Sequence, residues 1–147
     1  MRKTVSIMIL LLLALAASAE DKTLDQLKAE AERSDSGQQA KLCAEVAERL
    51  VSVADKQFTD GESVKAHATV QEVLQYATRA RDLAIKTRKK MKETEIHLRR
   101  CRHALENMRR TLAAEDRPAV EAVEKKLEQL SEEVLEAMFA PPKKENK

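Results

Sequence analysis

Apolar residues recur every three or four positions from residue 24 onward, which is the spacing that predicts amphipathic helices. A first helix is expected over about residues 23–33, and a second one is expected to run to about Phe58. Ser, Asp and Gly residues at 34–37 separate these helices, and Thr59-Asp60-Gly61 ends the second. A short break of this kind between two amphipathic segments predicts a helical hairpin.

The next apolar pattern is the longest in the chain, because no Gly or Pro interrupts it between Glu62 and Pro118. It repeats every seven residues, and its two apolar positions are occupied by Val70, Ala77, Ala84, Met91, Leu98, Leu105 and Leu112 and by Val73, Ala80, Thr87, Thr94, Cys101 and Met108. A repeat of this length predicts one long central helix that packs lengthwise against others. Small and polar residues make the repeat thin around Thr87, where a bend would divide the helix in two.

Pro118 ends this pattern because proline lacks a backbone donor, and a last amphipathic helix follows until Pro141. The chain has only 2 Gly and 3 Pro, where average usage would give about 17 of the two together. Two Phe, one Tyr and no Trp also disfavour a β-sandwich. We therefore expect an all-α fold with one helical domain over residues 20–140 and a disordered tail over 141–147. The domain would be an antiparallel helical bundle or an elongated helical hairpin with one long central helix.

Residues 1–19 have the layout of a secretory signal peptide. Arg2 and Lys3 provide the positive end, an apolar stretch covers residues 5–17, and Ala-Ser-Ala at 17–19 gives the small-residue cleavage pattern. An apolar stretch of about 13 residues is shorter than the about 20 that a membrane-spanning helix needs. We therefore expect cleavage between Ala19 and Glu20, export to the periplasm or outside the cell, and no transmembrane segment in the mature chain.

Charge is sorted along the chain, although the mature protein would be neutral with 25 basic and 25 acidic residues after removal of Arg2 and Lys3. Residues 20–75 hold 7 basic and 12 acidic side chains, residues 76–110 hold 12 and 4, and residues 111–147 hold 6 and 9. A basic helix lying between acidic ones would explain this sorting. Exposed ion pairs contribute only about 0–1 kcal/mol each, so the pattern would set orientation and partner choice more than stability.

The densest basic stretch is a candidate face for an anionic partner, and its residues are Lys86, Arg88, Lys89, Lys90, Lys92, Arg99, Arg100 and Arg102. One interpretation is a solvated face that pairs with acidic neighbours in the molecule. The other is contact with an anionic lipid or polymer of the cell envelope. Nucleic acid is disfavoured as a partner, because the stretch lacks aromatic residues that stack on single strands and lacks a groove-reading motif.

Cys43 and Cys101 are the only cysteines of the chain, and two interpretations of them stay open. An exported chain meets an oxidising compartment in which paired cysteines form disulfides, or both are small buried apolar side chains. His97 shares a helix face with Cys101, yet two ligands fall short of the four that zinc takes. Ser63 and His67 also share a face, but the sequence shows no acid partner for a catalytic triad. No catalytic, cofactor-binding or metal-binding residue is therefore predicted.

Between residues 50 and 73, a turn at Gly61 is preceded by Leu50, Val53 and Ala54 and followed by Ala66, Val70 and Val73. This spacing resembles a single tetratricopeptide-like helical hairpin. The family's large aromatic and its proline are replaced by Gln57 and Thr78, and no second repeat follows 34 residues later. Because one hairpin cannot build the peptide-binding groove of stacked repeats, the resemblance implies a fold only. The chain as a whole also resembles small exported bacterial helical proteins, which implies no site residues.

These features predict a non-enzymatic exported helical protein with an interaction or structural role, which contacts another protein or a second copy of itself through helix faces. The alternative is a periplasmic holdase-type chaperone or a binder of an anionic envelope polymer. The apolar stripe of Leu98, Cys101, Leu105 and Met108 bears on this choice. Either part of it stays exposed as an interaction site, or the last helix folds back after Pro118 and buries it.

Overall fold

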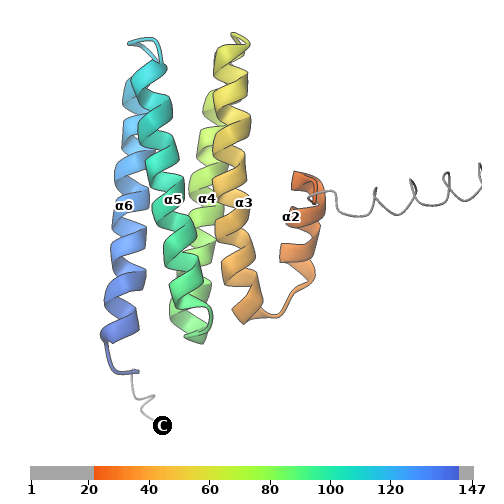
Figure 1. Cartoon of the computed structure of the whole chain (residues 1–147), viewed down its shortest axis with the longest axis vertical. Helices are drawn as coiled ribbons and strands as arrows, with labels where there is room; N and C mark the ends of the chain where they lie inside the picture. The colour runs from red at the N-terminus through yellow and green to blue at the C-terminus, as the bar shows by residue number, and fades with distance from the viewer. Residues whose placement is uncertain (1–21, 143–147) are drawn as a thin grey trace, which may run out of the picture.

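The computed structural model describes residues 22–142, and within this range the chain forms five α-helices and no β-strand (Figure 1). They are α2 (Leu24–Arg33), α3 (Ser36–Thr59), α4 (Ser63–Thr87), α5 (Met91–Thr111) and α6 (Arg117–Phe139). The all-α class is therefore confirmed. The expected signal peptide, its cleavage site between Ala19 and Glu20, and residues 143–147 of the expected tail lie outside the described residues. No described helix combines the length and the apolar character needed to cross a membrane.

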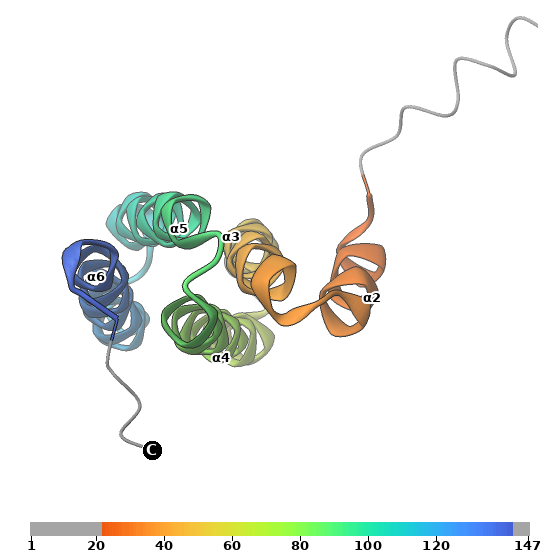
Figure 2. The same cartoon turned by 90° about the horizontal axis from the view of Figure 1, so that it is seen from below.

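Four of these helices form an antiparallel bundle made of two hairpins, α3–α4 and α5–α6 (Figure 1, Figure 2). Seen from one end, α3 lies beside α5 and α4 lies beside α6, while α2 packs on the outer side of α3 (Figure 2). Consecutive helices run in opposite directions, so α3 and α5 point the same way, as do α4 and α6. The α3–α4 hairpin turns at Gly61, whose φ of 77° is a conformation that glycine adopts readily. Of the two expected architectures, the antiparallel helical bundle is correct.

The expectation of one long central helix is wrong, because the structure has two helices there, α4 and α5. They are joined by a turn at Arg88, Lys89 and Lys90, directly after the bend that the thin repeat indicated at Thr87. Arg88 and Lys90 adopt a left-handed backbone conformation, with φ of 57° and 55°. Such residues are usually glycine, so the sequence carries no ordinary signal for this turn.

Two contacts hold the turn against the rest of the bundle. The Arg88 guanidinium donates hydrogen bonds of 2.9 Å to the carbonyl oxygens of Ala137 and Ala140 at the end of α6. These carbonyl groups belong to a helix end, which leaves them without a partner inside the helix. Lys89 packs against Gly37 in the first turn of α3, so closely that a Cβ atom at Gly37 would lie 2.9 Å from Lys89 Cβ. The turn therefore joins helix ends from both hairpins.

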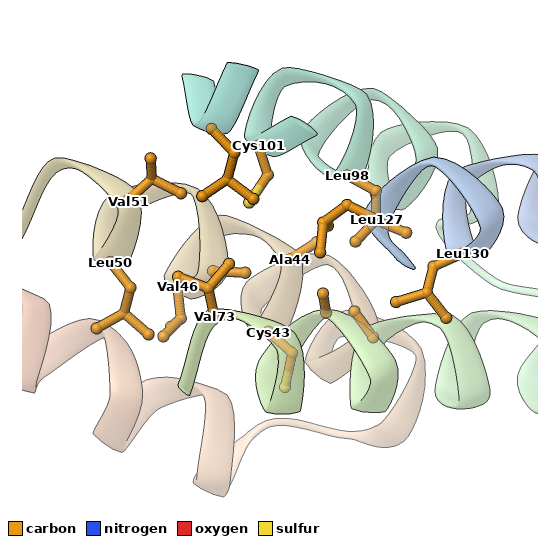
Figure 3. Close-up of a cluster of buried hydrophobic side chains, with 14 of the residues drawn as sticks. Cys43, Ala44, Val46, Leu50, Val51, Val73, Leu98, Cys101, Leu127 and Leu130 are labelled. Carbon is orange, nitrogen blue, oxygen red and sulfur yellow. The ribbon is translucent and has the colours of Figure 1, made fainter. Parts of the chain in front are cut away.

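The core is filled by the apolar positions that the periodicity indicated (Figure 3). Every position of the seven-residue repeat from 70 to 112 is buried except Thr87, which is half-buried. The stripe at 98, 101, 105 and 108 lies inside the bundle, where α3 and α6 pack on α5. Figure 3 shows Leu98 of α5 beside Leu127 of α6. Burial of this stripe by the last helix is therefore correct, and its exposure as an interaction site is wrong.

Side chains at the helix ends explain where several helices begin. Thr23 and Gln26 form a capping box at the start of α2, in which Thr23 Oγ1 accepts from the Gln26 amide at 3.2 Å. Asp35 accepts from two backbone amides in the first turn of α3. These acceptors satisfy amides that have no partner within the helix. Pro118 lies in the first turn of α6, where its missing N–H removes no helical hydrogen bond.

Candidate interaction surface

The eight basic residues of the expected anionic-partner face do not share one surface. They divide between the end of α4 with Lys86, the turn with Arg88, Lys89 and Lys90, and α5 with Lys92, Arg99, Arg100 and Arg102. The turn residues make contacts inside the molecule, since Arg88 bonds to the end of α6, Lys89 covers Gly37, and Lys90 lies 3.6 Å from Glu93. The structure therefore gathers the other basic residues mainly on one helix, α5.

Basic side chains run along the solvent side of α5, and we define the α5 basic row as Lys92, Arg99, Arg100, His103 and Arg110. All five residues are exposed. The row extends about 27 Å, because an α-helix rises 1.5 Å per residue. Carboxylates of the same helix neutralise part of it, since Glu95 lies 3.7 Å from Arg99 and Glu106 lies 3.7 Å from His103.

Glu106 illustrates how far basic side chains outnumber carboxylates on α5. Arg102, His103 and Arg110 all contact its carboxylate. The hydrogen bond from Arg110, together with the nearby positive charges, lowers the pKa of Glu106 below its ordinary value. Among residues 22–142, no ion pair involves Lys92 or Arg100. The row therefore presents positive charge to solvent.

An acidic row on α6 runs next to the α5 basic row. Ser131 Oγ donates to Glu95 at 3.1 Å, and Arg109 Nε donates to Glu124 at 2.7 Å. These two contacts show which side of α6 faces α5. Beside that side lie three exposed carboxylates without an ion pair in the described part of the chain. We define the α6 acidic row as Glu128, Glu132 and Glu136.

The end of α6 adds exposed apolar surface to the same region. Leu135 is 44% exposed and Phe139 is 81% exposed. Residues four apart lie on one side of a helix, so the two side chains are neighbours, and Leu135 in turn follows Ser131 by four residues. Adjacent exposed apolar side chains mark interaction sites more often than scattered single ones. We call these two residues the Leu135–Phe139 pair.

An acid partner for Ser63 and His67, which the sequence did not reveal, is present in the structure. Asp116, in the connection before α6, lies 2.7 Å from His67 Nε2, and Ser63 Oγ donates to Asp116 at 3.5 Å. Phe58 packs edge-on against the His67 ring, with the ring centroids 5.2 Å apart. The serine of a catalytic triad donates to the histidine, whereas Ser63 donates to the carboxylate. The cluster thus ties the start of α4 to the α5–α6 connection.

The pair of His97 and Cys101, considered above as two metal ligands, is divided between two environments. His97 Nδ1 lies 2.6 Å from Glu48 Oε2 on α3, at the surface between the helices. Cys101 is completely buried in the core. Within the described residues, no three His, Cys, Asp or Glu side chains are placed to hold a metal ion.

Both cysteines are free thiols in the structure, so the disulfide between Cys43 and Cys101 is not formed. Figure 3 shows their side chains apart, Cys43 near α4 and Cys101 on the α5 side of the core. Burial raises the pKa of Cys43 to about 11 and also raises the pKa of Cys101. Because the thiolate is the reactive form of cysteine, both side chains are poor nucleophiles in the folded protein.

The surface hollows of the described residues suit a second surface better than a small molecule. One, of about 600 Å³, is lined by α4 alone and runs past Leu74 and Leu83. Another, of about 270 Å³, lies between α3 and α5 at Glu48, His97 and Arg100. Small-molecule sites enclose most of their ligand in a concave pocket, and a hollow along one helix cannot do so. The α5–α6 surface is therefore the better candidate for function.

Comparison of the chain with protein-family models, with curated proteins and with solved structures found no match. The resemblance of residues 50–73 to a tetratricopeptide hairpin therefore gains no support from a relative. Charge and exposure on α5 and α6 are the observations from which a function can be argued.

Proposed function

We propose that this chain is a non-enzymatic helical binding protein that contacts an acidic surface of a partner protein through the α5 basic row. The observation that carries the proposal is the line of five exposed basic residues along one helix. A single exposed ion pair contributes only about 0–1 kcal/mol, so several pairs must form together to give affinity. Lys92, Arg99, His103 and Arg110 share one side of a rigid helix, with Arg100 next to them toward α3, so several pairs can form together. Their excess of positive charge also raises the rate of encounter with an acidic surface.

The width of the row favours a narrow partner. The α6 acidic row borders it on one side, and Glu45 and Glu48 of α3 border it on the other, next to Arg100. A membrane or a broad anionic polymer would press negative charge against these carboxylates as well, and like charges oppose association. A single acidic helix would meet the basic row alone. We therefore favour an acidic protein segment over the anionic envelope polymer.

Charge reversal on α5 tests the proposal. The double variant Lys92→Glu and Arg100→Glu changes two exposed side chains that form no ion pair with a described residue, so its circular dichroism should match wild type. We expect its affinity for poly-L-glutamate at low salt to fall about 10-fold or more, because attraction becomes repulsion. The matched control is Lys56→Glu and Lys65→Glu, which makes the same change of net charge at exposed positions of α3 and α4.

The control should bind poly-L-glutamate much as wild type does. An equal loss of affinity in both double variants would mean that net charge, and not the α5 basic row, determines binding, which contradicts the proposal. Undiminished binding by the α5 variant would contradict it as well. Binding to dextran sulfate without binding to poly-L-glutamate would favour the anionic-polymer alternative.

Export is part of the same proposal, because the signal peptide expected over residues 1–19 would bring the protein to partners outside the cytoplasm. N-terminal sequencing of protein recovered from outside the cytoplasm should find Glu20 first, whereas recovery with Met1 retained would contradict cleavage. We also propose that the likeness of residues 50–73 to a tetratricopeptide hairpin is one of fold, confined to the α3–α4 hairpin.

A further inference from the structure

We infer that the acidic surface that meets the α5 basic row is the α6 acidic row of a second copy of this chain, so that the protein forms a two-fold dimer through its α5–α6 face. The inference rests on the proposed function and names its partner. Its basis is that one face of the molecule carries both halves of a complementary contact, side by side. A two-fold interface requires such a self-complementary surface.

The contacts between α5 and α6 give the height of each charge along the bundle. The helices are antiparallel, so residue numbers rise on α5 as they fall on α6 (Figure 1). The hydrogen bonds from Ser131 to Glu95 and from Arg109 to Glu124 each mark one height. Residues of α5 and α6 that lie at similar heights are then Arg99 and Arg100 with Glu128 and Glu132, and Lys92 with Glu136.

Two copies can be placed face to face in two ways, and charge selects one of them. A two-fold axis perpendicular to the helices places α5 on α5, so that basic row meets basic row, which like charges oppose. A two-fold axis parallel to the helices places α5 of each copy opposite α6 of the other at the same height. In this second arrangement the α5 basic row meets the α6 acidic row twice, once on each side of the axis.

The Leu135–Phe139 pair adds an apolar contact to the same arrangement. At its height the other copy presents the start of α5, where Ile96 is half-buried on the solvent side. A phenylalanine side chain buries about 150–250 Å² when it is covered. Two helices of about 30 Å length and 10 Å width give a face of about 600 Å², hence about 1,200 Å² for the dimer, the lower end of specific interfaces. We therefore expect a reversible, concentration-dependent dimer.

A charge-swap experiment tests the inference by sedimentation velocity over a concentration series of the purified protein. Lys92→Glu with Arg100→Glu places two carboxylates in the α5 basic row, and Glu132→Lys with Glu136→Lys places two ammonium groups in the α6 acidic row. Each double variant alone should raise the dimer dissociation constant about 100-fold, because at the substituted positions like charges then face each other on both sides of the axis. Mixing the two variants should restore dimers, since both contacts of the mixed pair join opposite charges. The Lys56→Glu and Lys65→Glu control should dimerise as wild type does.

The outcomes separate this inference from the proposed function. A protein that stays monomeric and still binds poly-L-glutamate through α5 would overturn the dimer and leave the proposed function standing. A dimer that persists in both reversed variants would place the interface elsewhere and overturn the inference. So would folded variants that fail to associate when mixed. Phe139→Ser should weaken the dimer without changing poly-L-glutamate binding, and unchanged dimerisation would remove the Leu135–Phe139 pair from the interface.

Discussion

Replacing each left-handed residue of the α4–α5 turn by glycine should separate backbone strain from side-chain contacts. Arg88 and Lys90 have φ of 57° and 55°, a conformation that is about 1–2 kcal/mol less favourable for a residue with a Cβ atom. Glycine relieves this strain but raises the entropy of the unfolded chain, which lowers stability by about 0.4–1 kcal/mol. The backbone alone would therefore gain about 0.5–1 kcal/mol at either position.

The side chains make the two positions different. Lys90 would lose an exposed contact with Glu93 at 3.6 Å, which contributes little in water. Lys90→Gly should therefore raise the free energy of unfolding by about 0.5–1 kcal/mol. Arg88 would lose its two hydrogen bonds to α6, and bonds from a charged donor contribute about 1.5–3 kcal/mol. Because Arg88 is exposed, we take the lower end, about 1.5 kcal/mol, for the two together. After the backbone gain is subtracted, Arg88→Gly should lower stability by about 0.5–1 kcal/mol.

Urea unfolding followed by circular dichroism measures both variants against wild type. A difference of about 1.5 kcal/mol between them corresponds to about 0.8 M in the urea midpoint, for a slope of about 2 kcal/mol per M. Equal shifts in the two variants would mean that the Arg88 contacts to α6 contribute nothing. A loss of stability in Lys90→Gly would refute the reasoning from backbone strain.

The outcomes of several other changes follow from the structure, and urea midpoints measure each. Thr94→Val should raise the free energy of unfolding by about 1 kcal/mol, because the buried Thr94 hydroxyl has no partner among the described residues. Thr69→Val should lower it by about as much, because the Thr69 hydroxyl donates a hydrogen bond to Gln57. Equal effects of the two substitutions would contradict this reasoning. Leu98→Ala should remove about 3 kcal/mol, since Leu98 is fully buried, and a loss below about 1 kcal/mol would argue against its burial. Stability should fall as pH rises from about 9 to about 11, because the unfolded Cys43 thiol ionises near 9 and the folded one near 11. Cys43→Ala should reduce that fall without abolishing it, because burial also raises the pKa of Cys101, and an unchanged slope would refute this cause.

The buried residues were predictable because burial in a helix repeats with the helix itself. Val120, Val123, Leu127, Leu130 and Val134 stand three or four residues apart in the sequence, and all five are buried. The ends of α2 and α3 were predictable from local signals, since Asp35 offers a capping acceptor and Gly61 permits a left-handed turn. In each case the cause lies within a few residues of its effect.

The contacts between helices were not predictable, because they depend on how the helices align. His67 meets Asp116 and His97 meets Glu48, and both pairs are separated by 49 residues. No spacing rule links residues that far apart, and a chain with 25 acidic residues offers many partners for each histidine. The two charged rows have the same origin, since α5 and α6 become neighbours only when the chain turns at residues 112–116.

The seven-residue repeat continues in register across the break between α4 and α5 for a geometric reason. Ala84 and Met91 are seven residues apart and both are buried, although the turn lies between them. The three turn residues take the place of about one helical turn. The buried positions therefore stay seven residues apart in the sequence, whether the helix continues or the chain reverses direction. The length of the helix available to bury the stripe decides between a continuous helix and a reversal, because α3 has 24 residues and extends only about 36 Å. A continuous helix would leave Leu98 and the rest of its stripe beyond α3, whereas reversal buries side chains worth about 1.5–3 kcal/mol each. That gain exceeds the strain at Arg88 and Lys90, about 1–2 kcal/mol each.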